Sequence, residues 1–92
     1  MATNIAQIIF NNDENFQTKE IIMSSLSEVY SIDNFPLDED LKENNSFEIT
    51  FYTKWSESRE ELEVFATENN ISIIGVVYEF SSNYVNSYYF NH

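Results

Sequence analysis

The stretch that decides the fold class is Phe47-Glu48-Ile49-Thr50-Phe51-Tyr52-Thr53. Its side chains alternate, so that Phe47, Ile49 and Phe51 share one face of an extended chain while the residues between them share the other. This alternation is typical of a strand whose sheet has one face on the core and one face toward water. The pattern therefore predicts an open sheet that helices cover on one side.

Further strands are predicted on both sides of this stretch. Ile5 to Phe10 is a short apolar run, and Asn11-Asn12-Asp13 after it suits the N-cap of a helix. Ile71 to Phe80 is rich in β-branched and aromatic residues, and a further run extends from Tyr84 to Phe90. Because Ser81-Ser82-Asn83 separates these last two runs, we expect them to form a hairpin.

Two helices are predicted between the strands. The first, from about Glu14 to Tyr30, has an apolar stripe at three- and four-residue spacings, made of Phe16, Ile22, Met23, Leu26, Val29 and Tyr30. The second is expected to begin at Ser58, whose spacing from Glu61 fits a capping box, or at Ser56, which suits a cap equally, and to end near Asn69-Asn70. Residues 31–46 contain the only proline and are predicted to be a loop with a helical turn at its centre.

The predicted order is β-α-β-α-β-β, and we expect one domain spanning residues 1–92. The fold class is α+β, a ferredoxin-like open four-stranded sheet with two helices on one face. An aromatic content of 16% favours a folded chain over the disorder that acidic composition can produce.

The net charge of −12, from 16 Asp and Glu against four Lys and Arg, narrows the possible partners. Such a surface repels phosphate backbones and anionic lipids and attracts basic protein surfaces. We therefore expect no direct nucleic acid and no membrane as partners. The start of the chain has no basic residue before its apolar run, and no apolar stretch approaches the ~20 residues of a membrane span, so we expect a cytoplasmic protein.

Catalytic and cofactor chemistry has little support in this sequence. The chain has no cysteine, its one histidine is the last residue, and its one glycine cannot form a phosphate-binding loop. The cluster Asp38-Glu39-Asp40 with Glu43 has the wrong spacing for an EF-hand loop, which makes a solvated acidic loop the better interpretation. We expect no enzyme activity, no cofactor and no metal.

Two short segments carry a resemblance to a known family. Phe51-Tyr52-Thr53-Lys54-Trp55-Ser56, then a helix, then Gly75-Val76-Val77-Tyr78-Glu79, resembles the YubB-type ferredoxin-like domain of plasmid and phage proteins. Asn34-Phe35-Pro36-Leu37 lies where that family tends to carry Phe before Pro-containing sequence. The Pro pair that commonly follows the Trp is replaced by Glu57 and Ser58, and the middle segment is shorter. The resemblance implies a fold and an origin in a mobile element, and it transfers no catalytic residue.

The acidic residues concentrate in two segments, which we expect to form a partner-binding surface together with aromatic anchors. The predicted site residues are Asp38, Glu39, Asp40, Glu43, Glu57, Glu60, Glu61, Glu63, Glu68, Tyr52, Trp55 and Tyr78. Carboxylates at these positions would mimic phosphates and dock on Lys and Arg of a target. Solvation of the surface accounts for part of this charge, as does the favourable effect of early Glu residues on a helix dipole.

The expected function is a non-enzymatic inhibitor from a phage or plasmid. It would block the cationic nucleic-acid-binding site of a host defence complex, as anti-CRISPR or anti-restriction proteins do. The partner is then a basic or nucleic-acid-binding protein in the host cytoplasm. An alternative is a structural or assembly module that forms a homodimer by edge-to-edge pairing of the hairpin Ile71 to Phe90.

Overall fold

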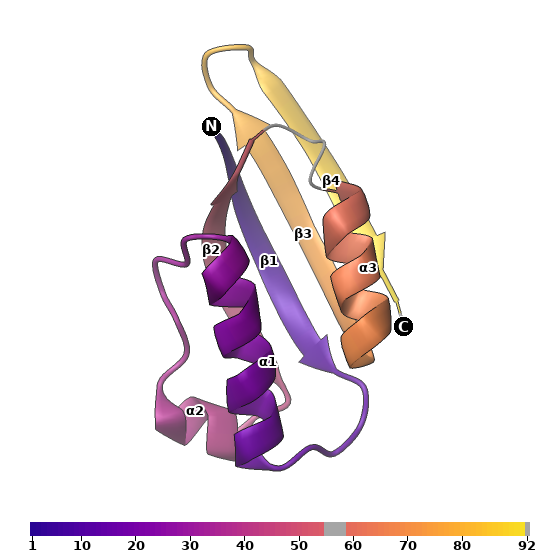
Figure 1. The fold of residues 1–92 in the computed structure, drawn as a ribbon. Helices are drawn as coiled ribbons and strands as arrows, with labels where there is room; N and C mark the ends of the chain where they lie inside the picture. The colour runs from indigo at the N-terminus through magenta and orange to yellow at the C-terminus, as the bar shows by residue number, and fades with distance from the viewer. Residues whose placement is uncertain (55–58, 92) are drawn as a thin grey trace.

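The computed structural model describes residues 1–54 and 59–91. The chain forms four strands and three helices within these residues (Figure 1). In chain order they are β1 (Ala2–Phe10), α1 (Phe16–Val29), α2 (Asp38–Glu43), β2 (Ser46–Thr53), α3 (Arg59–Asn69), β3 (Ile71–Glu79) and β4 (Tyr84–Phe90).

The four strands form one open antiparallel sheet in the order β2-β1-β3-β4. The predicted α+β class, the open sheet and the helices are confirmed. The ferredoxin-like topology is not matched, because the strands lie in the order β2-β1-β3-β4 along the sheet. A hydrophobic pattern shows that a segment is a strand, whereas it does not show which strand lies beside it.

The long connection between α1 and β2 follows from the antiparallel pairing of β1 with β2. After α1 the chain must return along the sheet to the end where β1 finishes, and it does so through residues 30–45, which include α2 (Figure 1). On the way it lies against the outer edge of β2. Asp33 N donates to Thr50 O at 3.0 Å, and Thr50 N donates to the Asn34 side chain at 2.6 Å. One edge of the sheet is therefore covered, and β4 is the other edge.

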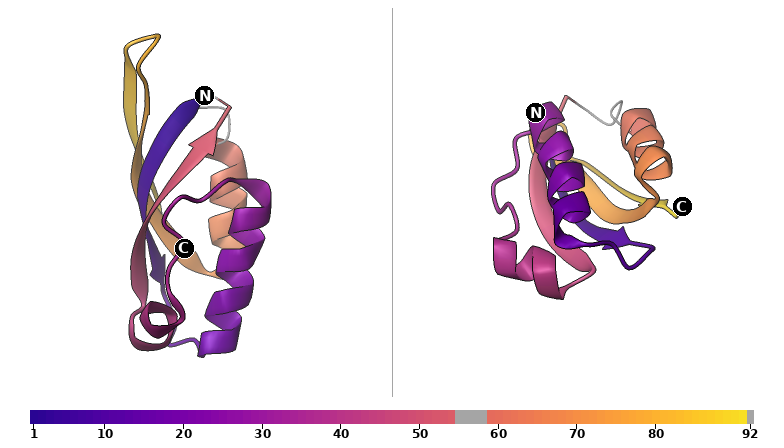
Figure 2. Two further views of the ribbon diagram at one scale, coloured as in Figure 1. Left: turned by 90° about the vertical axis from the view of Figure 1, so that its left-hand side faces the viewer. Right: turned by 60° about the horizontal axis from the view of Figure 1, so that its bottom comes forward.

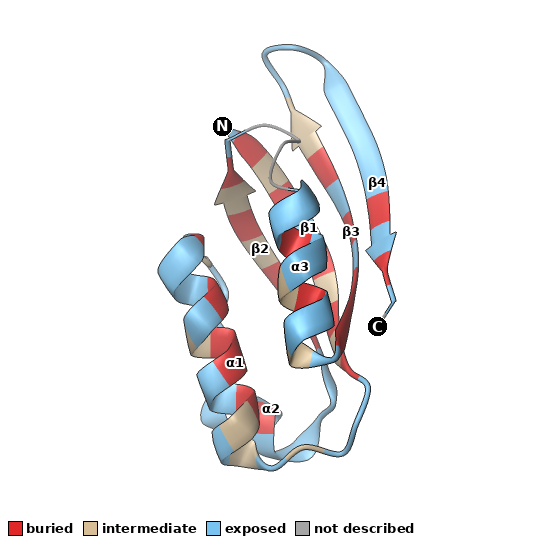
Figure 3. Cartoon of the chain, turned by 45° about the vertical axis from the view of Figure 1, so that its right-hand side comes forward, coloured by how far each residue is buried: buried red, intermediate tan, exposed pale blue. Residues whose placement is uncertain are grey.

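Helices α1 and α3 cover one face of the sheet (Figure 2). Alternate strand residues are buried beneath them, and Phe47, Ile49 and Phe51 are among these as predicted (Figure 3). The rings of Tyr30, at the end of α1, and Phe51 lie 5.3 Å apart. The two-layer arrangement leaves the other face of the sheet without a covering element among the described residues.

The start of α1 corrects one prediction. The N-cap is Asn15, whose side chain accepts a hydrogen bond from Thr18 N at 2.8 Å, and not a residue of Asn11-Asn12-Asp13. The polar run is longer than one turn, so several of its residues suit a cap equally well by type. The predicted caps of the second helix, Ser56 and Ser58, lie outside the described residues.

Lys19 is buried in α1, in a position that the apolar stripe did not predict. Its Nζ donates to the carbonyl oxygen of Asn44 at 2.8 Å, which ties α1 to the end of α2, and lies 6.0 Å from the centre of the Phe10 ring. The buried ammonium is satisfied by a carbonyl at the C-terminal end of a helix, where positive charge is favoured. One of the four cations is consequently withdrawn from the surface.

A chain of buried hydrogen bonds crosses the whole sheet. The Tyr88 hydroxyl of β4 donates to Asn4 Oδ1 of β1 at 2.9 Å, and Asn4 Nδ2 donates to Thr53 Oγ1 of β2 at 3.0 Å. Tyr88 reaches Asn4 by passing over Gly75 of β3. A Cβ at Gly75 would lie 2.8 Å from the Tyr88 hydroxyl and 2.8 Å from Ala6 Cβ, so only glycine fits there. The only glycine of the chain thus makes room for the tyrosine that links the edge strand to the other three.

Substitution of Gly75 by Ala tests this packing. We expect Gly75→Ala to lower the free energy of unfolding by about 1–3 kcal/mol, because the added methyl group overlaps Tyr88 and the backbone of Ile5. Urea denaturation followed by circular dichroism measures the loss. The matched control is Val76→Ala on the exposed side of the same strand, which we expect to cost less than about 1 kcal/mol. Equal losses for the two variants would contradict the packing account.

Removal of the Tyr88 hydroxyl tests the hydrogen-bond chain. Tyr88→Phe takes away the donor to the buried Asn4 Oδ1, and we expect a loss of about 1–3 kcal/mol in the free energy of unfolding. Tyr89→Phe, on the exposed side of the same strand, is the control and should change stability by no more than about 0.5 kcal/mol. A Tyr88→Phe variant as stable as this control would show that the chain contributes nothing.

The same hydroxyl predicts sensitivity to alkaline pH. Burial raises the pKa of Tyr88 above its ordinary value, because the phenolate is poorly solvated inside the protein, and Tyr30 adds to the shift. A folded-state pKa above the unfolded value of ~10 gives stability that is present below pH ~10 and lost as the pH rises further. Urea titrations above pH ~10 should therefore show a shallower decline in unfolding free energy for Tyr88→Phe than for the wild type. Identical slopes would refute this assignment.

Candidate protein-binding surfaces

The first predicted acidic cluster lies on α2 and is exposed. Asp38, Glu39 and Asp40 occupy the first turn, and Glu43 occupies the last residue of this short helix. The N-cap residue Leu37 makes no side-chain capping bond. The negative charges of the first-turn carboxylates instead compensate the backbone N–H groups that have no partner within the helix. Leu41 is the buried residue that holds α2 on the protein.

The second predicted cluster lies on α3. Glu60, Glu61, Glu63 and Glu68 are exposed, while Leu62 and Ala66 face the sheet. At 1.5 Å per residue the four carboxylates extend over about 12 Å of the helix axis, or one per ~3–4 Å. This density is comparable with the 3.4 Å between charges along one DNA strand. We call the predicted acidic residues of α2 and α3 the acidic helical face; they are Asp38, Glu39, Asp40, Glu43, Glu60, Glu61, Glu63 and Glu68.

The acidic helical face has two separate parts. Helix α1 lies between α2 and α3 in both Figure 1 and the right view of Figure 2. The exposed residues of α1 include Gln17, Ile21 and Ser25, so neutral side chains as well as Glu20 and Glu28 separate the two clusters. Glu61 differs from its neighbours because its Oε2 accepts a hydrogen bond from the Tyr30 hydroxyl at 3.1 Å.

The carboxylates of this face form no ion pair among the described residues, although Lys42 lies on α2 and Arg59 at the start of α3. Across residues 1–54 and 59–91 the one ion pair joins the N-terminal amine to Glu79 at 3.2 Å, away from α2 and α3. Lys42 of α2 has its Nζ 5.1 Å from the centre of the Phe16 ring, and Lys19 is buried. The intramolecular contacts therefore leave the negative charge of the helices available to a cationic partner.

The second surface is the uncovered side of the sheet, which we call the open sheet face. Strand alternation and register direct to it Thr3, Ile5, Gln7, Ile9, Ser46, Glu48, Thr50, Tyr52, Ser72, Ile74, Val76, Tyr78, Val85, Ser87 and Tyr89. Glu48 is the only charged side chain among them. Neighbouring pairs on this face include Ile5 with Val76 and Ile74 with Tyr89, so apolar groups lie next to one another across the strands.

The predicted aromatic anchors Tyr52 and Tyr78 lie on the open sheet face, where both pair with Thr3. The Tyr52 hydroxyl donates to Asp33 Oδ2, and this bond is the main cause that raises the pKa of Tyr52. The sheet thus separates these tyrosines from the acidic helical face, although the sequence had placed them in one site. The remaining predicted residues, Trp55 and Glu57, lie outside the described residues.

The β3–β4 hairpin projects beyond the helices (Figures 1 and 2). Phe80 at its turn is 86% exposed and contacts the Tyr78 ring at 4.9 Å between ring centres. Glu79 is the charged residue of the hairpin. A hydrogen bond from the Ser81 side chain lowers the pKa of Glu79, and the N-terminal amine contributes further. Phe80 therefore extends the apolar surface of the sheet at the hairpin turn.

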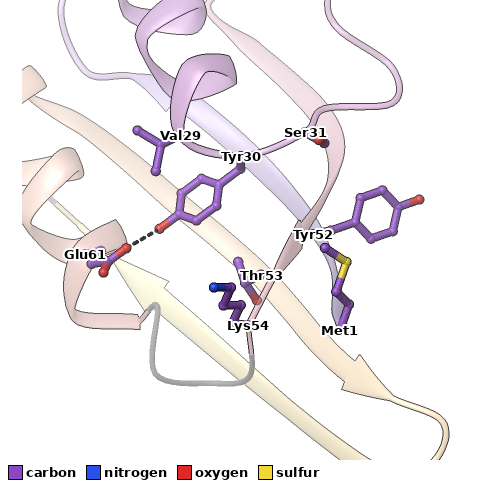
Figure 4. A pocket seen from close by; sticks show the side chains of 8 residues that line it. All are labelled: Met1, Val29, Tyr30, Ser31, Tyr52, Thr53, Lys54 and Glu61. Atoms are coloured by element: carbon purple, nitrogen blue, oxygen red, sulfur yellow. Dashed lines mark hydrogen bonds between the residues drawn. The ribbon is translucent and has the colours of Figure 1, made fainter.

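A hollow of about 690 Å³ opens between the ends of α1 and β2 and the start of α3. Figure 4 shows Tyr30 pointing to Glu61 across it, while Tyr52 points the other way. Glu61 is the only carboxylate among the described residues that line the hollow, and the cationic groups of these residues are Lys54 and the N-terminal amine of Met1.

Neither a metal-binding cluster nor a membrane-spanning helix is found among the described residues. In residues 1–54 and 59–91, no three His, Cys, Asp or Glu side chains are grouped so that they could hold a metal ion. No helix in the same part of the chain is long and apolar enough to cross a membrane.

Sequence reasoning missed the apolar residues of the open sheet face, among them Ile5, Ile74 and Val76. A signal for them was present, because Ile71 to Phe80 is apolar at both alternating sets of positions. Such a run is typical of a strand covered on both faces. Two helices packed on one side cover only one of these sets, so the other set must be exposed.

Comparison with known proteins finds no protein-family model, no curated protein and no solved structure that matches the chain. The resemblance to the YubB-type family therefore stays a prediction.

Proposed function

We propose that this chain is a non-enzymatic inhibitor from a mobile element that binds a basic, nucleic-acid-binding protein of the host cytoplasm. The target is a cationic nucleic-acid site of a host defence complex, of the anti-CRISPR or anti-restriction kind. The observation that carries the proposal is the acidic helical face, whose carboxylates are exposed and lack ion-pair partners among the described residues. A cationic groove supplies the counter-charges that the chain does not.

The mechanism is electrostatic competition with nucleic acid. The carboxylate density of α3 resembles that of one DNA strand, so Lys and Arg side chains that hold phosphates can hold these carboxylates. Long-range attraction speeds the encounter and makes binding sensitive to salt. Because α1 separates the two clusters, α2 and α3 contact different parts of the target groove.

Charge reversal on α3 tests the proposal. The Glu60→Lys/Glu63→Lys variant removes two exposed carboxylates and keeps Glu61, which accepts a hydrogen bond from the Tyr30 hydroxyl, and Asp13→Lys/Glu14→Lys is a control with the same net charge. The immobilised variants and wild type are exposed to the heparin-binding proteins of a host lysate at about 50 mM and about 200 mM NaCl. We expect wild-type capture of a nucleic-acid-binding protein at the lower salt, at least tenfold weaker binding by the α3 variant, and little change in the control.

The captured protein then supplies a direct assay of inhibition. Added wild-type chain should displace a labelled DNA or RNA from it, and the α3 variant should not. Two results would refute the role of this surface. One is equal capture of the protein by wild type and both variants, and the other is displacement of the nucleic acid by the α3 variant as effective as that by wild type.

A further inference from the structure

The open sheet face combines exposure with the near absence of charge. Ile74 and Val76 are 45% and 39% exposed, and Val85 and Tyr89 on the neighbouring strand are exposed further. Apolar groups that lie together on one face of a soluble domain mark an interaction surface. Glu48 is the one charged side chain that the strands direct to this face, in a chain with 16 carboxylates.

The distribution of charge indicates which partner fits. A basic protein is attracted to the acidic helical face and gains little from a neutral sheet. A second copy of this chain is repelled at the helices by its own excess of acid, yet among the described strand residues of the open sheet face it meets one carboxylate, Glu48, with Asp33 beside the face as acceptor of the Tyr52 hydroxyl. With layers about 10 Å apart, face-to-face stacking of two sheets places the two helical layers roughly 30 Å from each other. This separation exceeds the Debye length of ~8 Å at physiological salt, so most of the repulsion is screened.

The size of the face is also sufficient for a weak dimer. Four strands about 4.8 Å apart, with about seven residues each at ~3.3 Å, give a footprint of about 19 by 23 Å. Two facing copies therefore cover on the order of 900 Å² before the relief of the side chains is counted. The uneven surface of the side chains and the projecting Phe80 increase the buried area toward the ~1,200 Å² at the lower end of specific interfaces.

Face-to-face contact accounts for the exposed apolar side chains of the open sheet face, whereas pairing at the edge of the sheet does not. Edge-to-edge pairing of β4 would form an eight-stranded sheet and leave the apolar face of both copies in water. Within β4, moreover, the Asn86 side chain accepts a hydrogen bond from Ser87 N at 2.9 Å, which competes with an incoming strand for that group. Stacking removes the apolar side chains from water in both copies at once.

We propose that the open sheet face binds the same face of a second copy, so that two chains form a symmetric dimer with both acidic helical faces directed outward. The dimer is independent of the function proposed above, because it uses the opposite side of the sheet.

Sedimentation equilibrium of the full chain from about 5 to 500 μM, at about 50 and 500 mM NaCl, tests the dimer. We expect a dimer that tightens at the higher salt, because screening weakens the repulsion between two chains of charge −12 each. Binding of a cationic partner to the acidic helical face would weaken under the same change, so the two interactions are distinguishable.

Three single substitutions locate the interface. Ile74→Lys on the open sheet face should raise the dimer dissociation constant at least tenfold. Val64→Lys is the matched control, since Val64 is 54% exposed on α3 and the substitution adds the same charge; we expect a change of less than about threefold. Ile5→Lys, on a strand that is not at the edge, should weaken a face-to-face dimer and leave a β4-edge dimer intact. Circular dichroism confirms that each variant is folded.

A wild-type chain that stays monomeric at both salt concentrations would overturn the proposal, as would a dimer that loosens at high salt. A normal dimer in Ile5→Lys, or equal weakening by Val64→Lys and Ile74→Lys, would also overturn it. The wild-type salt series needs no variant, so it tests the dimer itself even if a substitution unfolds the chain.

Discussion

The hydrogen bond from the Tyr88 hydroxyl to Asn4, made across Gly75, is the interaction on which the arrangement of the sheet depends. It joins the edge strand β4 to the central strand β1, and Asn4 passes the connection on to Thr53 of β2. A shift of one residue in the register of β3 or β4 would move Gly75 or Tyr88 to the other face and leave Asn4 Oδ1 buried without its donor. The chain of bonds therefore favours one register of all four strands.

The two surfaces of the protein follow from that register. With Tyr88 and Phe90 directed to the helices, Val85 and Tyr89 must point to the other side, and the same alternation exposes Ile74 and Val76 on β3. Helices α1, α2 and α3 together contribute ten of the 16 carboxylates, four of them from α2. One layer of strands thus separates an acidic surface from an apolar surface to which the strands direct one charged side chain, Glu48, and each is suited to a different kind of partner.

The sequence predicted the strands and helices well because each has a clear periodicity. The alternation in Phe47–Thr53 and the spacing of Ile22, Met23 and Leu26 both depend on local geometry that a pattern records directly. Strand order and the contacts of single polar residues depend on segments far apart in the chain. Asn4 and Tyr88 are 84 positions apart, and nothing in either neighbourhood indicates that they meet. For the same reason, composition identified the acidic residues, whereas only the arrangement of the strands in the sheet shows that they lie on the opposite side from Tyr52 and Tyr78.

The two proposals combine into one picture of a dimer that presents acid on both outer sides, able to engage two cationic grooves or two parts of one. The separation of the two surfaces is its central claim, and an NMR experiment tests it most directly. In a ¹⁵N-labelled sample, amide shifts are recorded while spermine is added, and then while the protein alone is diluted. The account predicts that spermine shifts the amides of α2 and α3, while dilution shifts those of β1, β3 and β4 around Ile5, Ile74 and Tyr89. Shifts from both perturbations at the same residues would contradict it.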